Sequence, residues 1–166
     1  MKNLKSFTLL SNELEGQVGI KHIFKNEECP GENISPHLKW VNPPKGTESF
    51  AVTVYDPDAP TGSGWWHWLI FDIPKEVQEL ASDAGNPRKH IAPQGSIQSI
   101  TDYLTHGYGG PFPPKGDKAH RYIFTVYALD VRSLDLNKDA SPAMVGFNLN
   151  FHTIARASLI SYFERK

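Results

Sequence analysis

The sequence has a single cysteine, Cys29, among its 166 residues, so no disulfide can form within the chain. This favours a reducing compartment, and we expect a cytoplasmic protein. No stretch reaches the ~18 apolar residues of a membrane-spanning helix. The apolar stretches near the N-terminus are too short for a secretory signal. We therefore expect no stable insertion into a membrane.

The chain also lacks a charge bias. Its 17 Lys and Arg and 18 Asp and Glu give a formal net charge of −1, and no Lys/Arg run is present. Proteins that bind nucleic acid usually carry a basic excess, so we predict no nucleic-acid partner. The sequence has no P-loop, no dinucleotide-binding fingerprint and no Gly-x-Ser-x-Gly motif, which argues against the enzyme classes that depend on them.

Glycine and proline, in contrast, are abundant, with 13 of each, more than the usual combined share of about 12%. This surplus argues against a helical bundle and for a strand-rich fold with long loops. Segments 48–55, 66–73 and 121–129 are nearly continuous runs of large side chains, as in strands in the middle of a sheet. A shorter strand is predicted at 6–10. The length suits one domain spanning residues 1–166.

One helix start is clear. Ser141 suits the N-cap and Pro142 the first helical position. Residues 155–163 alternate in character and permit a final strand. Between them, over 143–154, four apolar residues recur at helical spacing and form the apolar stripe of a helix: Met144, Phe147, Phe151 and Ile154.

Polar residues cluster first in a short turn that follows the strand at 48–55. Asp56 and Asp58 stand two residues apart in a turn that also contains Pro57 and Pro60. Because proline fixes φ, this turn is rigid. It either aims its carboxylates at a ligand or is a simple Asx-type turn with both aspartates in solvent.

A histidine between tryptophans begins the next predicted strand. Strict alternation along Trp66-His67-Trp68 puts both tryptophans on one face and His67 on the other. Histidine can donate a hydrogen bond to an anion, and its ordinary pKa of ~6.5 lets it be charged or neutral. The alternative is a core histidine that is satisfied by a backbone carbonyl.

The third polar segment combines a loop and a strand. Residues 107–116 hold four glycines and three prolines, and such a loop can bring backbone N–H groups close to an anion. In the strand that follows, His120 and Tyr122 share one face while Arg121 points to the other. We expect Arg121 to form a structural ion pair, with an aspartate of the first turn as its candidate partner.

Together the three segments make one candidate site. Two histidines and a carboxylate could hold a metal, but close ligand pairs such as His-x-x-x-His are missing, and we predict none. No nucleophile is evident either, since the two glutamates before Cys29 oppose thiolate formation. The chemistry that remains is an anion pocket, with histidines and backbone donors around a phosphate.

In order and spacing, these motifs resemble the phosphatidylethanolamine-binding protein family, also known as the Raf kinase inhibitor protein family. Two further segments, TGSG at 61–64 and AMVGF at 143–147, are similar to its bacterial YbhB/YbcL branch. The resemblance implies a mostly β fold with few helices, in which a large central antiparallel sheet accompanies a second, smaller sheet. It is carried by four segments: YDPDAP at 55–60, GWWHW at 64–68, PPKGDKAHRY at 113–122 and NISP at 33–36.

The resemblance also implies a small surface cavity for phosphate-like or carboxylate anions, including phospholipid head groups, and no cofactor. Asp58, Arg121 and Pro60 would support this cavity, and the Ala59–Pro60 bond is a candidate cis peptide. Eight residues would bind the ligand or wall the cavity: Asp56, His67, His120, Tyr122, Trp65, Phe112, Pro113 and Pro114.

We therefore expect a non-enzymatic binding protein whose partner is a small anionic ligand, with modulation of a kinase or another protein as a further role. Two alternatives stay open. One is a hydrolase or transferase that uses a pocket histidine as its general base. The other is a protein-interaction module without a functional pocket. The tryptophan-rich segment permits a homodimer without requiring one.

Overall fold

The structure is a computed structural model, and it describes residues 6–166. Within this range the chain is mostly β with one α-helix, α1 (Pro142–His152), and one short 3-10 helix, η1 (Ile20–His22). None of its helices is long and apolar enough to cross a membrane. The strands are β1 (Thr8–Leu10), β2 (Lys25–Asn26), β3 (Cys29–Pro30), β4 (Leu38–Val41), β5 (Ser49–Asp56), β6 (Trp65–Pro74), β7 (Glu79–Leu80), β8 (Ile97–Gln98), β9 (His120–Leu129) and β10 (Thr153–Phe163).

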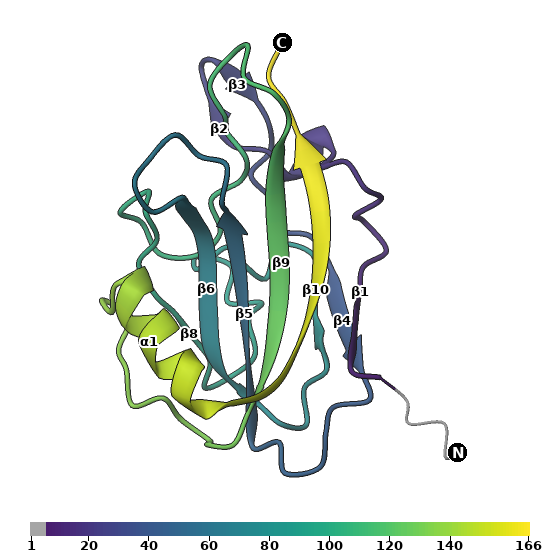
Figure 1. The fold of residues 1–166 in the computed structure, drawn as a ribbon, viewed down its shortest axis with the longest axis vertical. Helices are drawn as coiled ribbons and strands as arrows, with labels where there is room; N and C mark the ends of the chain where they lie inside the picture. Colours follow the sequence, from purple (N-terminus) through teal and green to yellow (C-terminus); the bar gives the residue numbers. More distant parts are fainter. Residues whose placement is uncertain (1–5) are drawn as a thin grey trace.

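A five-stranded antiparallel sheet in the order β10-β9-β5-β6-β8 forms the centre of the molecule (Figure 1). The three apolar runs of the sequence are its inner strands β5, β6 and β9, which confirms the prediction from their continuous large side chains. Each has a hydrogen-bonded strand on both edges, and because its large side chains point to both faces, both faces are covered by other parts of the chain.

A smaller sheet in the order β1-β4-β7 packs against one face of the central sheet. The core between the two sheets is aromatic and aliphatic, and Trp40 of β4 meets Phe50 of β5 at a ring distance of 5.3 Å. In Figure 1, β4 lies behind the central sheet. The fold is therefore the one that the sequence predicts, a large antiparallel sheet with a smaller second sheet and few helices.

Helix α1 covers part of the opposite face of the central sheet (Figure 1). Ser141 caps it by accepting a hydrogen bond from the Met144 N–H at 3.2 Å, as predicted. The inward residues, however, are Val145 and Leu149, which pack on Leu69 of β6 and its neighbours. The helix predicted over 143–154 is confirmed as far as His152, but its apolar stripe faces solvent: Met144, Phe147, Phe151 and Ile154 lie 48%, 62%, 65% and 43% exposed.

The immediate start of β10 explains this rotation of the helix. Thr153 is both the C-cap of α1 and the first residue of β10, and its N–H and hydroxyl bind the Leu149 carbonyl. Because β10 pairs with β9 from Thr153 onward, there is no linker in which the helix could turn. Pairing of the strand thus fixes which side of α1 faces the sheet, whatever the apolar spacing suggests. The predicted final strand at 155–163 is confirmed within β10.

Candidate functional site

A cavity of about 380 Å³ opens where the end of β5 meets the starts of β6 and β9. These three strand ends meet at one edge of the sheet because neighbouring strands run antiparallel. The lining includes Ala59, Pro60, Thr61 and Tyr103. It also includes all eight residues named from the sequence as ligand or wall residues: Asp56, His67, His120, Tyr122, Trp65, Phe112, Pro113 and Pro114.

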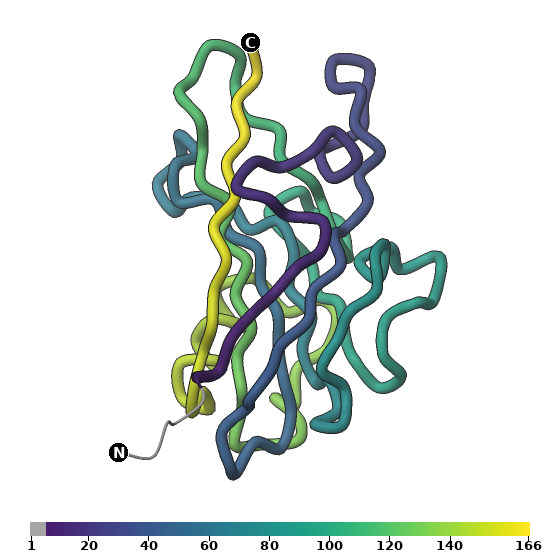
Figure 2. Tube along the Cα trace, turned by 90° about the vertical axis from the view of Figure 1, so that its right-hand side faces the viewer, coloured from purple at the N-terminus to yellow at the C-terminus, as the bar shows by residue number. Residues whose placement is uncertain are grey.

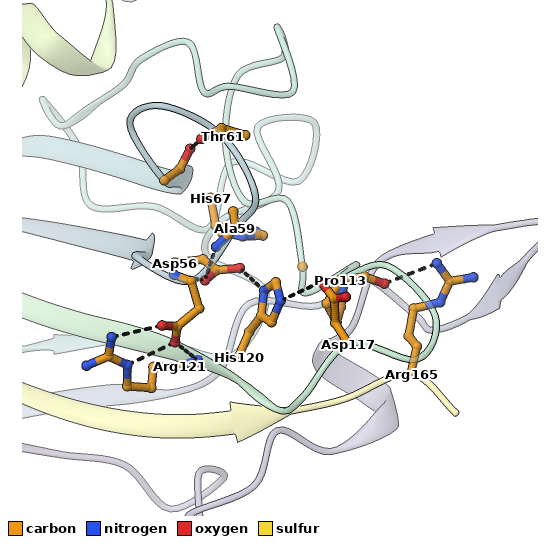
Figure 3. Close-up of polar contacts among 12 residues, drawn as sticks. Asp56, Ala59, Thr61, His67, Pro113, Asp117, His120, Arg121 and Arg165 are labelled. Carbon is orange, nitrogen blue, oxygen red and sulfur yellow. Dashed lines mark hydrogen bonds and ion pairs between the residues drawn. The ribbon is translucent and has the colours of Figure 1, made fainter.

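Asp56, the last residue of β5, is buried and its carboxylate is fully engaged. Its Oδ1 accepts hydrogen bonds from the backbone N–H groups of Asp58 and Ala59 at 2.8 and 3.1 Å. Its Oδ2 lies 2.8 Å from Nδ1 of His120, which is buried as well (Figure 3). Asp56 therefore closes the turn and orients His120, and a fully solvated Asx-type turn is excluded.

Asp58 pairs with Arg121, as the sequence predicts. The Arg121 guanidinium reaches Asp58 Oδ2 and Oδ1 at 2.9 and 2.8 Å, and the Arg121 backbone N–H adds a bond of 2.9 Å to Oδ2. The guanidinium hydrogen bond holds the pKa of Asp58 well below its usual range, against a smaller opposing effect of burial. Neither residue lines the cavity, so this pair ties the turn to β9 from outside.

The Ala59–Pro60 peptide bond is trans, so the prediction of a cis bond is wrong. The chain reverses direction here with a trans bond because other hydrogen bonds close the turn. Asp56 Oδ1 accepts two backbone N–H groups, and the Thr61 N–H donates to the Ala59 carbonyl at 2.7 Å. The loop then reaches Gly64, whose φ of +67° disfavours other residues. A β-carbon there would lie 2.6 Å from the Asp56 carbonyl oxygen, so glycine lets the loop pass directly over the end of β5.

His67 reaches the cavity through a β-bulge. Val54 pairs with Trp68 and Tyr55 pairs with Trp66, so β6 has one residue more than β5 here. The two tryptophans consequently lie on opposite faces: Trp68 is in the core between the sheets, and Trp66 packs with the cluster under α1. The strict alternation predicted from the sequence is wrong, because a bulge adds a residue and re-aims the side chain beside it.

The buried His67 ring is satisfied by the backbone on one side. Its Nδ1 lies 2.7 Å from the Gly109 carbonyl oxygen, so Nδ1 carries the proton. Burial lowers the pKa of His67 to about 4, and His67 is neutral at physiological pH. The core-histidine interpretation is thus correct for Nδ1, while the ring as a whole still lines the cavity. Nε2 is left with a lone pair.

Two polar atoms of the cavity wall have no hydrogen-bond partner within residues 6–166: the Tyr122 hydroxyl and Trp65 Nε1. Tyr122 is fully buried, and its ring meets His67 edge-on at 5.2 Å. Burial, with the nearby charge of Asp56 as a smaller cause, raises the pKa of Tyr122, so its hydroxyl keeps its proton. A buried donor without an acceptor is costly, and such groups usually meet a ligand or an ordered water.

The proline-rich wall is held by residues distant in sequence. Asn33 of the NISP segment accepts the Gly110 N–H at 2.7 Å and donates to the Tyr108 carbonyl at 3.1 Å. Arg165 lies 4.1 Å over the Phe112 ring and donates to the Pro113 carbonyl at 3.2 Å (Figure 3). In Figure 2 the C-terminal end of the chain runs beside this loop.

Three residues near the cavity were not found from the sequence. Tyr103 stacks on Phe24 at 4.7 Å and donates from its hydroxyl to the Gly110 carbonyl, but it lies in an irregular loop without a periodic pattern. Asp117 lies 3.3 Å from His120 Nε2, and only its i, i−3 spacing from His120 was visible. Arg165 is brought to the loop by the length and register of β10.

Comparison with known proteins agrees with these motifs. The profile of the phosphatidylethanolamine-binding protein family matches residues 11–164. The chain belongs to the phosphatidylethanolamine-binding protein family. It is 48% identical over 158 residues to YbhB of Escherichia coli, and the match covers 94% of this chain and 99% of that protein. It is 45% identical over 163 residues to YbcL of the same bacterium, covering 97% of this chain and 89% of that one.

Solved structures confirm the family fold. The crystal structure of E. coli YbcL, described as a member of the mammalian family, matches with a TM-score of 0.94 at 46% identity and covers 96% of this chain and 99% of that one. The phosphatidylethanolamine-binding protein of Plasmodium vivax shares the fold, with a TM-score of 0.58 at 17% identity over 97% and 86% of the chains. Family membership supports a binding protein.

Within residues 6–166 no group of three or more His, Cys, Asp and Glu side chains is placed to hold a metal ion.

Proposed function

We propose that this family member is a non-enzymatic binding protein whose cavity takes the phosphate-like or carboxylate group of a small ligand. The free hydroxyl of Tyr122 carries the proposal. It is a protonated donor on a fully buried residue in the cavity wall, and it has no acceptor among the described residues. An anion is the ligand group that such a donor stabilises most.

The other donors lie around the same space. Trp65 contributes an N–H that has no partner among residues 6–166, and His120, whose Nδ1 is bound to Asp56, has its Nε2 3.3 Å from Asp117 Oδ2. His67 is neutral and offers the lone pair of Nε2, which can accept a proton carried by the ligand. This set suits a phosphomonoester, a phospholipid head group or a carboxylate. A few local donors supply the affinity, since the chain has a net charge of only −1.

A titration with three anions tests the proposal. Phosphate, acetate and phosphorylethanolamine are added to the isotope-labelled protein, and the imidazole signals of His67 and His120 are followed by NMR. We expect saturable shifts of both. The absence of any shift with all three anions would refute an anion pocket.

Tyr122→Phe makes the test specific to the hydroxyl. The change removes one oxygen that has no hydrogen-bond partner among residues 6–166, so the free energy of unfolding should stay equal or rise. Anion affinity should fall about tenfold or more, the usual cost of losing a hydrogen bond to a charged group. Tyr127→Phe is the matched control, because Tyr127 lies on the same strand and its hydroxyl contacts Thr53 at 3.3 Å instead. Equal loss in both variants would contradict the proposal.

A second function is favoured by the Asp56–His120 pair. A buried carboxylate on Nδ1 of a histidine whose Nε2 faces a ligand site is the geometry of a general base. A hydrolase or transferase would show a turnover that His120→Ala abolishes while the protein stays folded. A broad screen of ester and phosphoester substrates without such turnover would leave binding as the function.

A protein partner is a separate part of the proposal. Modulation of a kinase or another protein would act through the occupied cavity, so capture of the partner should depend on Asp56 and His67. Capture that is unchanged by Asp56→Ala and His67→Ala would instead favour an interaction module without a functional pocket. The unpaired, buried Cys29 fits the reducing cytoplasm proposed for the chain.

A further inference from the structure

Nε2 of His120 is already in contact with a carboxylate of the chain itself. Asp117 Oδ2 lies 3.3 Å from Nε2, three residues before His120 (Figure 3). The opposite ring nitrogen, Nδ1, lies 2.8 Å from Asp56 Oδ2. His120 is thus held between two carboxylates, one deeply buried and one whose side chain is 42% exposed.

The two carboxylates engage both ring nitrogens of His120. An ionised carboxylate only accepts hydrogen bonds, so Asp56 makes Nδ1 of His120 a donor. Asp117 Oδ2 is placed to accept from Nε2 in the same way, so both ring nitrogens of His120 face carboxylates of the chain itself. The one His120 donor left for a ligand is therefore engaged by an internal anion.

The two carboxylates differ in how firmly they are held. Asp56 receives two backbone N–H groups besides His120, and it is buried. Among the hydrogen bonds of the described residues, the Asp117 carboxylate has only the one to His120, and half-exposed ion pairs are weak. Asp117 can rotate into solvent, whereas Asp56 cannot.

We propose that Asp117 is a tethered competitor that occupies His120 Nε2 until an anionic ligand displaces it, and that it selects against highly charged anions. This inference rests on the anion pocket proposed above. An internal competitor lowers affinity by its local concentration, because it is always within reach of its partner. After displacement its charge stays near the ligand and repels a dianion about twice as strongly as a monoanion, since Coulomb energy scales with the product of the charges.

The test compares two ligands and three variants by calorimetric titration at low salt. A phosphomonoester such as glycerol phosphate is dianionic at about pH 8, and acetate is a monoanion. Asp117→Asn should raise affinity about tenfold for the phosphomonoester and about threefold for acetate. Asp117→Ala, which cannot bond to His120, should show the same order. Both gains should shrink at high salt, where charges are screened.

Glu164→Gln is the matched control. It removes one negative charge from the residue next to Arg165, whose carbonyl accepts the Gly116 N–H at 3.0 Å. Glu164 itself pairs with Lys166, at 3.7 Å, and not with His120. Its affinities should change less than about twofold. A similar gain in Glu164→Gln would overturn the competition, and equal gains for both anions in the Asp117 variants would overturn the selection against highly charged anions.

The remaining outcomes separate the two proposals. If the wild-type protein binds both anions and the Asp117 variants bind them with equal or lower affinity, the competitor is refuted and the anion pocket stands. If the wild-type protein and all variants bind neither anion, the pocket itself is refuted, and the competitor with it. Binding that appears only in the Asp117 variants would support both.

Discussion

Arg121 holds the Asp58 carboxylate with three N–H groups, two from its guanidinium and one from its backbone, at 2.8–2.9 Å. The pair joins the turn after β5 to the start of β9, on the outside of the cavity. It therefore sets the distance between the two segments that supply Asp56 and His120. A contact made by both side chain and backbone fixes position more firmly than an ordinary surface ion pair.

The first prediction concerns this pair. Asp58→Asn should lower the thermal midpoint by about 3 °C and weaken anion affinity severalfold, because Asp56 and His120 lose their alignment. Asp130→Asn, which breaks an exposed pair with His152 at the far end of β9, is the control. Calorimetry and ligand titration check both effects. An unchanged ligand affinity in Asp58→Asn would show that the pair stabilises the turn alone.

The second prediction follows from the low pKa of His67. The folded protein takes up this proton only near pH 4, whereas the unfolded chain does so near ~6.5. The unfolded state thus binds more protons in between, and stability falls as the pH drops from ~6.5 toward 4, by up to ~3 kcal/mol from this group. Below pH 4 this contribution stops changing.

Urea denaturation at a series of pH values measures the slope. His67→Gln keeps an N–H for the Gly109 carbonyl and removes the titration, so its stability should depend less on pH between ~6.5 and 4 than that of the wild type. His152→Gln, at the exposed end of α1, is the control. Parallel curves for wild type and His67→Gln would contradict the burial of a neutral ring.

The third prediction separates the two sides of α1. Leu149→Ala should cost about 2–4 kcal/mol of stability, because Leu149 is 3% exposed in the cluster on the central sheet. Phe147→Ala should change stability by less than ~0.5 kcal/mol, since Phe147 is 62% exposed and touches mainly Phe151, at 4.9 Å. Equilibrium unfolding in urea checks both. A larger loss of stability in Phe147→Ala than in Leu149→Ala would show that the Phe147 side of the helix faces the sheet instead.

The fourth prediction concerns Arg165, which contacts the cavity wall through Phe112 and Pro113. Arg165→Met keeps a long apolar stem and loses the hydrogen bond and the cation–π contact. Anion affinity should drop about three- to tenfold, mostly through faster dissociation, and amide exchange at Gly116 should accelerate. Lys166→Met, one residue on, should do neither. Unchanged exchange at Gly116 would mean that the loop at 107–116 keeps its conformation without Arg165.

Local sequence was sufficient where a single physical rule decides the outcome. Continuous apolar runs identified the inner strands β5, β6 and β9, and the Ser141-Pro142 pair identified the start of α1. The proline-clamped turn at Asp56 and the alternation of His120, Arg121 and Tyr122 required only backbone geometry. Asp56, His120 and Tyr122 accordingly line one cavity in the structure, while Arg121 lies outside it.

Tertiary packing decided what local rules could not. The bulge that turns His67 toward the cavity depends on how β6 pairs with β5, and the rotation of α1 depends on how β10 pairs with β9. The contacts of Asp117 with His120 and of Arg165 with Phe112 form only after the strands set the register of the segments that carry them. The sequence alone therefore determined which groups take part and on which strands. The pairing of those strands determined which atoms face the cavity and which are already bound, because hydrogen-bond partners far apart along the chain are fixed only by the assembled sheet.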